Sequence, residues 1–342
     1  MKIHIRRENN NILKAILVAI PVVMFVIILL STADDIFGNI FINIIENITL
    51  FFENFNFVGI IGRIILVICI FLYLSSFFDN LACRYEVSKA DECEKFNNED
   101  NTTVKIILGA LNIIYIVFCF IQIKSLFMKV DIENYSSYAR KGFFQLMIVS
   151  LINFVMILIA KNYVKSKNNK FVNIMSIIMI ICTFIILVSA GYRMYLYENA
   201  YGYTLLRLLV YITLFTETIL LVPTIIYVID KPINLKKSYF VIIMIVYVGI
   251  NFLNLDNIIA ENNVDRYFKT GKLDVYYLKN ETGTDAIKQL KRIVENDLPN
   301  EESREIQEKI KEYIIEVQNN IIETPMDFRD FNLSKFMVKN IF

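Results

Sequence analysis

Glu217 is the residue of this 342-residue chain whose placement most clearly invites chemistry, because it lies inside a long apolar run. A charged residue at the centre of a bilayer costs roughly 2.5 to 3.5 kcal/mol, so this carboxylate needs a partner, a water-filled cavity or a proton. Pro223 has no backbone N–H and leaves the carbonyl of Ile219 without its helical donor. Glu217 is therefore a candidate proton or cation site, and the alternative is a protonated or paired residue with a structural role.

Polar side chains form stripes on two further apolar segments. Asn112, Tyr115 and Gln122 share one face of a predicted helix, and Asn251 shares a face with Tyr247 in another. Such faces can line a polar path through a helix bundle, which makes these residues candidate ligand contacts. They can equally supply hydrogen bonds between helices, a common role of amide and hydroxyl groups in membranes.

Basic and tyrosine residues gather at two predicted membrane entry points. Arg140 precedes one apolar run, while Arg193, Tyr197 and Tyr201 recur at four-residue intervals on one helical face. Arg207 follows that face across a short tyrosine-rich turn. Together these residues predict a basic, tyrosine-lined mouth for an anionic substrate or lipid headgroup. Anchoring at the membrane interface is the alternative.

The elements that must position these residues are membrane helices. Hydrophobic residues make up 56% of the chain and charged residues 20%, which predicts an all-α, polytopic integral membrane helix bundle with a small C-terminal helical extramembrane region. A cytoplasmic segment, 1–12, precedes a membrane domain at 13–255, and the segment 32–57 predicts an interfacial helix. The apolar runs predict about seven transmembrane helices, at 13–31, 58–78, 103–127, 143–164, 171–190, 205–229 and 239–255. The first run is longer than the apolar part of a signal peptide, so we expect it to remain uncleaved.

Lys and Arg in the loops predict the orientation. Fifteen lie on the side that holds the N-terminus and five on the other, and basic loops stay in the cytoplasm. We therefore expect a multi-pass protein of the bacterial plasma membrane, with the N-terminus cytoplasmic, the C-terminus outside and the lipid bilayer as its partner.

The charged region 256–342 holds 17 acidic and 13 basic residues. Apolar residues at helical spacing predict amphipathic helices over 284–296 and 301–322, broken by Pro299 and ended by Pro325. Two helices bury little by themselves. We therefore expect this region to pack on the membrane domain or on a partner.

Several kinds of chemistry are excluded or disfavoured. His4 is the one histidine, so histidine-based zinc sites and a Ser-His-Asp triad are excluded. The five cysteines lie mostly in apolar runs without metal-ligand spacing. We expect no metal and no cofactor, an enzyme is not favoured, and the nearly neutral charge argues against nucleic acid as a partner.

Three ordered motifs resemble a known family. They are Tyr138-Ala-Arg-x-Gly-Phe-Phe-Gln-Leu146, the stretch from Arg193 to Arg207, and the stretch that begins at Asn254-x-Asp256. The sequence from Leu13 to about Leu290 resembles bacterial polytopic membrane proteins catalogued as domain of unknown function 4173, which is related to 4153. The resemblance implies a bacterial membrane protein without a known activity. It favours the outer mouth, with Asp256 added to the arginines, as the shared feature.

Two functions follow as hypotheses. The first is transport or binding of a small or anionic ligand through a polar bundle interior. The alternative is a non-enzymatic envelope scaffold or sensor that presents the C-terminal helices to envelope proteins, with anionic lipid as a further partner.

Overall fold

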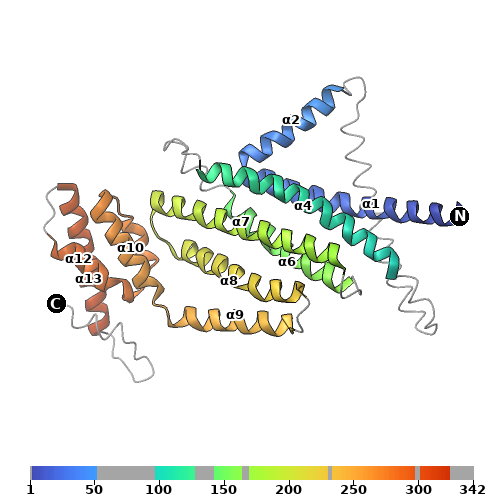
Figure 1. Ribbon diagram of the computed structural model, residues 1–342. Coiled ribbons are helices and arrows are strands. Elements are labelled where there is room, and N and C mark those ends of the chain that lie inside the picture. Colours follow the sequence, from blue (N-terminus) through green and yellow to red (C-terminus); the bar gives the residue numbers. More distant parts are fainter. Residues whose placement is uncertain are drawn as a thin grey trace. The chain divides into compact units, whose positions relative to one another are not determined.

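The computed structural model describes residues 2–51, 97–127, 142–163, 169–229, 233–296 and 301–323, and all regular elements in these ranges are helices (Figure 1). Long apolar runs form most of them, because a helix satisfies its own backbone groups where water is absent. In chain order the helices are α1 (Lys2–Ala33), α2 (Asp35–Phe51), α4 (Asn97–Phe127), α6 (Phe143–Tyr163), α7 (Lys170–Tyr201), α8 (Leu205–Val228), α9 (Leu235–Phe252), α10 (Leu255–Thr270), α11 (Val275–Asn280), the short 3-10 helix η1 (Thr284–Ala286), α12 (Ile287–Glu295) and α13 (Glu301–Glu323).

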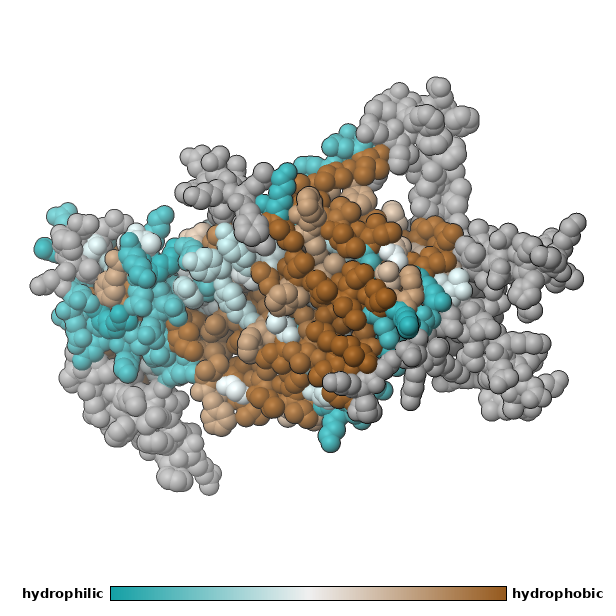
Figure 2. All heavy atoms as spheres, in the orientation of Figure 1, coloured by the Kyte–Doolittle hydropathy of each residue, from teal (hydrophilic) through white to brown (hydrophobic). Residues whose placement is uncertain are grey.

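Five of the described helices, α4, α6, α7, α8 and α9, are long and apolar enough to cross a membrane. Two shorter apolar helical segments, Val18–Ala33 in α1 and Asp35–Ile44 in α2, accompany them. Figure 2 shows hydrophobic residues gathered over the long helices and hydrophilic residues over the C-terminal ones. The expected all-helical fold is therefore confirmed for the described residues, and five of their helices are candidate membrane spans. The predicted second span, 58–78, lies outside the described residues.

The chain divides into two compact units. The first comprises the described residues of Met1–Arg193 and Glu217–Tyr239, and the second those of Met194–Thr216 and Phe240–Phe342. In the first unit α1 packs against α4, α6 and α2.

Hydrogen bonds fix the helix directions in the first unit. Asn112 of α4 bonds to the carbonyl of Met175 in α7, and Cys119, later in α4, bonds to the carbonyl of Cys182, later in α7. Because the contacts follow the same order in both helices, α4 and α7 are parallel. In α6 the order is reversed, because Asn153 bonds to Thr183 whereas the later Lys161 bonds to the earlier Asn173. Helix α6 is therefore antiparallel to α7.

The second unit has a core of its own, formed by α10, α11, α12 and α13. Its buried residues include Val264 and Tyr267 of α10, Leu290 of α12, and Ile310 and Ile314 of α13. The sequence predicted α12 and α13 from their apolar periodicity but not α10 or α11. The two helices expected from the sequence would bury little by themselves, whereas these four helical segments together form a buried apolar core.

Candidate functional site

Glu217 lies in the first unit within a buried polar layer that draws on three helices. We call this the Glu217 layer, and it consists of Ser150 and Asn153 of α6, Thr183 of α7 and Glu217 of α8. All four side chains are at most 2% exposed. The hydroxyl of Ser150 donates to Oε2 of Glu217, and Nδ2 of Asn153 donates to the hydroxyl of Thr183 over 2.9 Å. Ser150 and Asn153 are three residues apart in α6 and share a face.

Two acceptors of the Glu217 layer have no hydrogen-bond partner among the described residues. They are Oε1 of Glu217 and Oδ1 of Asn153, and both are buried. A buried acceptor left without a donor costs roughly 1 to 3 kcal/mol, more when it carries charge. Hydroxyl, amide and carboxylate oxygens are the atoms with which proteins hold protons, hard cations or water.

Arg193 occupies a different buried site, which we call the corner cluster: Asp34, Gln122, Ser189 and Arg193. Arg193 donates to Oδ2 of Asp34 and to the carbonyl of Ala33, each over 2.5 Å, and to Oε1 of Gln122 over 3.0 Å. Nε2 of Gln122 also reaches Oδ2 of Asp34, at 2.9 Å, and Ser189 donates to Gln122 over 2.5 Å. The cluster joins the α1–α2 corner to α4 and α7. The charge of Arg193 is therefore neutralised within the protein.

Local structure explains why Asp34 can serve this cluster. It is the single non-helical residue between α1 and α2, and its Oδ1 accepts from the backbone N–H groups of Ile36 and Phe37, at 3.0 Å each. Asp34 thus caps α2 with one oxygen, as aspartate does at a helix start, and binds Arg193 with the other.

Gly142 lies against the same cluster. It has φ +95°, and a Cβ atom added there would stand 2.1 Å from the carbonyl oxygen of Ala33 and 2.8 Å from a guanidinium nitrogen of Arg193. Glycine is required here because L side chains avoid positive φ and because a Cβ atom would clash with the carbonyl of Ala33. One residue of the predicted basic motif therefore has a packing role at the corner cluster, while its neighbour Arg140 lies outside the described residues.

The predicted stripe on α4 faces α7. Asn112 donates to the carbonyls of Leu108 and Met175, at 2.9 and 3.0 Å, and Gln122 belongs to the corner cluster. The hydroxyl of Tyr115 is buried and has no partner among the described residues. Protein groups therefore hold Gln122 and Nδ2 of Asn112, whereas Oδ1 of Asn112 and the hydroxyl of Tyr115 have no partner among the described residues.

Three residues of the predicted mouth meet in the second unit. The guanidinium of Arg207 lies 4.4 Å from the ring centre of Tyr197 and 6.0 Å from that of Tyr201, and it donates to the carbonyl of Gly202. Cation–π contacts of this kind contribute of order 1 kcal/mol each. Arg193, on the same helical face in the sequence, contacts Asp34 instead.

The turn between α7 and α8 is tied to α10. Gly202, with φ +86°, ends α7. Asn263 accepts from the N–H of Tyr203 and donates to its carbonyl, at 2.9 and 2.8 Å. Arg266 donates to the carbonyls of Asn199 and Ala200, where a cation is favoured by the helix dipole. The basic residues here cap a helix end.

The remaining predicted residues lie apart. Asn251 is exposed and donates to the carbonyl of Tyr247 in its own helix, at 2.7 Å. Asp256 accepts from the N–H of Gly283 over 2.9 Å, which closes the connection before η1. Neither belongs to the Glu217 layer or to the tyrosine contacts of Arg207.

Sequence reasoning missed Asp34, Ser150 and Ser189. Asp34 carried a usable signal, because it follows an apolar run and precedes a helical one, as an N-cap does. Nothing in the spacing of the two serines distinguishes them from other hydroxyls in apolar helices, which satisfy themselves by bonding to a carbonyl one turn earlier.

Comparison with known proteins identifies a family without an activity. A family model described as "Domain of unknown function (DUF4153)" matches residues 2–293. No curated protein and no solved structure matches the chain. The match names 4153, the relative of the family 4173 that the motifs resemble, and it does not show 4173 itself. Because the match covers most of the chain, the protein belongs to the DUF4153 family.

Proposed function

We propose that this protein binds or carries a small ligand through the polar interior of its helix bundle, with Glu217 as the group that takes up a proton or a small cation. One observation carries the proposal: Oε1 of Glu217 is buried and has no partner among the described residues. A fully paired carboxylate would have suited a purely structural role better.

The charges around the site favour a proton or cation over an anion. Every member of the Glu217 layer offers oxygen, and both open atoms are acceptors. Arg193, a buried cation of the first unit, is held by Asp34 over 2.5 Å. An anionic ligand at Glu217 would add negative charge to a buried carboxylate, whereas a proton or cation would neutralise it.

Infrared spectroscopy tests the role of Glu217 directly. A protonated carboxyl group has a C=O stretch separate from the amide bands, and the Glu217→Gln variant identifies which band belongs to this residue. We expect that band to change when pH is raised or when an alkali cation is added, and to be missing from the variant. A band that stays constant across pH and cation series would assign Glu217 a fixed structural proton and refute the proposal.

A ligand beyond the proton can be sought by thermal stability. Binding to the folded state raises stability by mass action, so soluble metabolite fractions should stabilise the wild type but not Glu217→Gln. Tyr115→Phe asks whether the unpaired hydroxyl of Tyr115 contributes, and Asn251→Ala, outside the buried layer, is the matched control. Stabilisation that is equal in all four proteins would place the ligand elsewhere.

The proposal includes seven crossings of a bacterial plasma membrane, with the N-terminus inside and the C-terminus outside. Helices α1 and α4 support this count. Gln122, near the end of α4, bonds to Asp34 at the end of α1, and the two helices pack together, so they run in the same direction. An odd number of crossings must therefore lie between them, and the sequence offers one apolar run there, Val58–Phe78.

A second function, an envelope scaffold or sensor, is favoured by the second unit. Its helices α10–α13 have their own core, and the far side of α13 exposes a row of charges that includes Glu308 and Glu312. Deleting α13 would strip Ile310 and Ile314 from that core, so charge reversal is the cleaner test. Glu308→Lys with Glu312→Lys should abolish complementation of a deletion strain if partners bind there, and intact complementation would count against the scaffold.

A further inference from the structure

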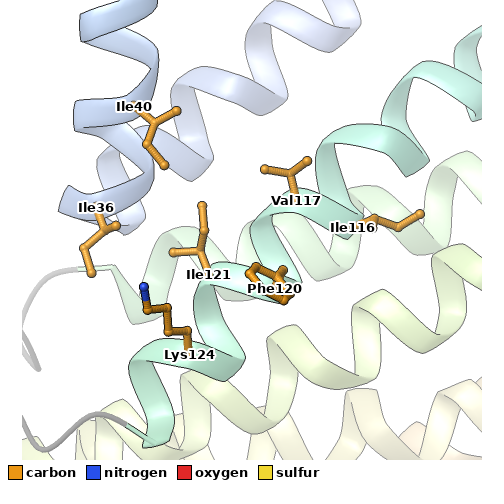
Figure 3. A pocket seen from close by; sticks show the side chains of 7 residues that line it. All are labelled: Ile36, Ile40, Ile116, Val117, Phe120, Ile121 and Lys124. Atoms are coloured by element: carbon orange, nitrogen blue, oxygen red, sulfur yellow. The ribbon is translucent and has the colours of Figure 1, made fainter.

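An apolar groove opens between α2 and α4 in the first unit. Its cavity volume is about 570 Å³. Ile36 and Ile40, one turn apart on α2, form one wall, and Val117 and Ile121 of α4 face them. Lys124 stands at the C-terminal end of α4 with its amino group toward this space (Figure 3).

We propose that this groove binds one acyl chain of an anionic phospholipid whose headgroup pairs with Lys124. The groove lies in the last two turns of a membrane-spanning helix, Thr102–Lys124. From Val117 to Lys124 the axial rise is about 10 Å. An acyl chain that starts at headgroup depth beside Lys124 therefore reaches Val117 within the hydrocarbon region.

The size of the groove favours a lipid chain over a helix from another protein. A helix about 10 Å across occupies roughly 800 Å³ over two turns, more than the 570 Å³ available. The walls offer aliphatic and aromatic side chains such as Phe120, and none of the wall residues is charged except Lys124. A flexible hydrocarbon chain is thin enough for this volume and suits the apolar walls.

Charge selects the headgroup. No carboxylate among the described residues forms an ion pair with Lys124 in the structure. Asp34, two residues before the α2 wall at Ile36, is bound by Arg193. A lysine at this depth extends its amino group to the interface, where a basic residue attracts anionic lipid.

Photo-crosslinking of the full chain in nanodiscs tests the site. The probes are phosphatidylglycerol and phosphatidylcholine, each with a diazirine in one acyl chain, and labelled residues are mapped by mass spectrometry. We expect labelling of the α4 segment 116–124 and of Ile36 or Ile40, with a preference for phosphatidylglycerol of about fivefold, the effect of one basic residue near a membrane surface.

Two variants on α4, each with a control on the same helix, test the binding of the acyl chain and of the headgroup separately. Val117→Trp fills the groove and should lower labelling severalfold, whereas Ile113→Trp, on an exposed face outside the groove, should not. Lys124→Gln should remove the headgroup preference, whereas Lys105→Gln, near the opposite end of α4, should leave it. Gel filtration checks that each variant is folded.

Three results would overturn the proposal. Equal labelling around Ile113 and in the groove would mean ordinary contact with bulk lipid. Equal labelling by the two probes in wild type and Lys124→Gln would remove the anionic headgroup. Crosslinks from a photoreactive residue at 117 to protein alone would show that protein covers the groove.

Discussion

At the scale of residues, the Asp34–Arg193 pair places two charges in the buried interior of the bundle. Both groups are at most 2% exposed, and removing one member of a buried pair leaves an uncompensated charge. The pair is acceptable because Gln122, the Ala33 carbonyl and two backbone N–H groups of α2 complete its hydrogen bonds. The cluster therefore works as one unit that joins α1, α2, α4 and α7.

The first prediction concerns Asp34→Ala. It removes the partner of Arg193 and the cap of α2 together, so we expect destabilisation by about 3 to 5 kcal/mol. Thermal unfolding in detergent measures the change. Asp35→Ala alters an exposed neighbour and should lower Tm far less. Equal shifts for the two variants would mean that the buried pair contributes little.

The second prediction compares two glycines of the same unit. At Gly142 a Cβ would stand 2.1 Å from a backbone oxygen, whereas at Gly109, inside α4, nothing lies within 4 Å. We expect Gly142→Ala to lower Tm clearly, since backbone must move, and Gly109→Ala to raise stability by up to about 1 kcal/mol through helix propensity. If both variants melted alike, the close approach at Gly142 would be relieved at low cost.

At the scale of elements, the C-terminal helices depend on a shared core. Ile314 of α13 is fully buried, whereas its neighbour Ile315 is 42% exposed. Truncation of a buried isoleucine costs about 2 to 5 kcal/mol. We therefore expect Ile314→Ala to make α13 sensitive to protease under conditions in which Ile315→Ala remains resistant. Equal resistance would show that α13 is held by something other than this core.

The sequence predicted the positions of helices better than it predicted the contacts between them. Periodicity placed α12 and α13, and hydropathy placed α4, α6 and α8, because these signals are local. Helix α10 was missed although Asn254 caps its start and Gly271 ends it in the left-handed region, since its apolar residues are few. The partner of Arg193 is 159 residues away, and no local pattern can encode that contact. Arg193 was consequently expected at an outer mouth with Tyr197 and Tyr201.

At the scale of the whole molecule, alternating helix directions constrain how the chain can cross a bilayer. Parallel α4 and α7 flank the antiparallel α6 in chain order, as successive crossings require. In the second unit α10, which follows α9, binds the turn between α7 and α8. The region after α9 therefore lies beside that turn, as expected if the two helices between them, α8 and α9, each cross the membrane once.

Reporter fusions test this topology at its weakest point, the crossing between α2 and α4. A phosphatase is active outside the plasma membrane and silent in the cytoplasm. We expect activity for fusions in the segment 32–57 and after Phe342, and silence for fusions in 79–101 and 165–170. The pair on either side of Val58–Phe78 is decisive, because equal activity at both would remove that crossing. The orientation rests on the charge bias of the loops, so a reversed pattern at all four positions would keep the count of seven and invert the protein.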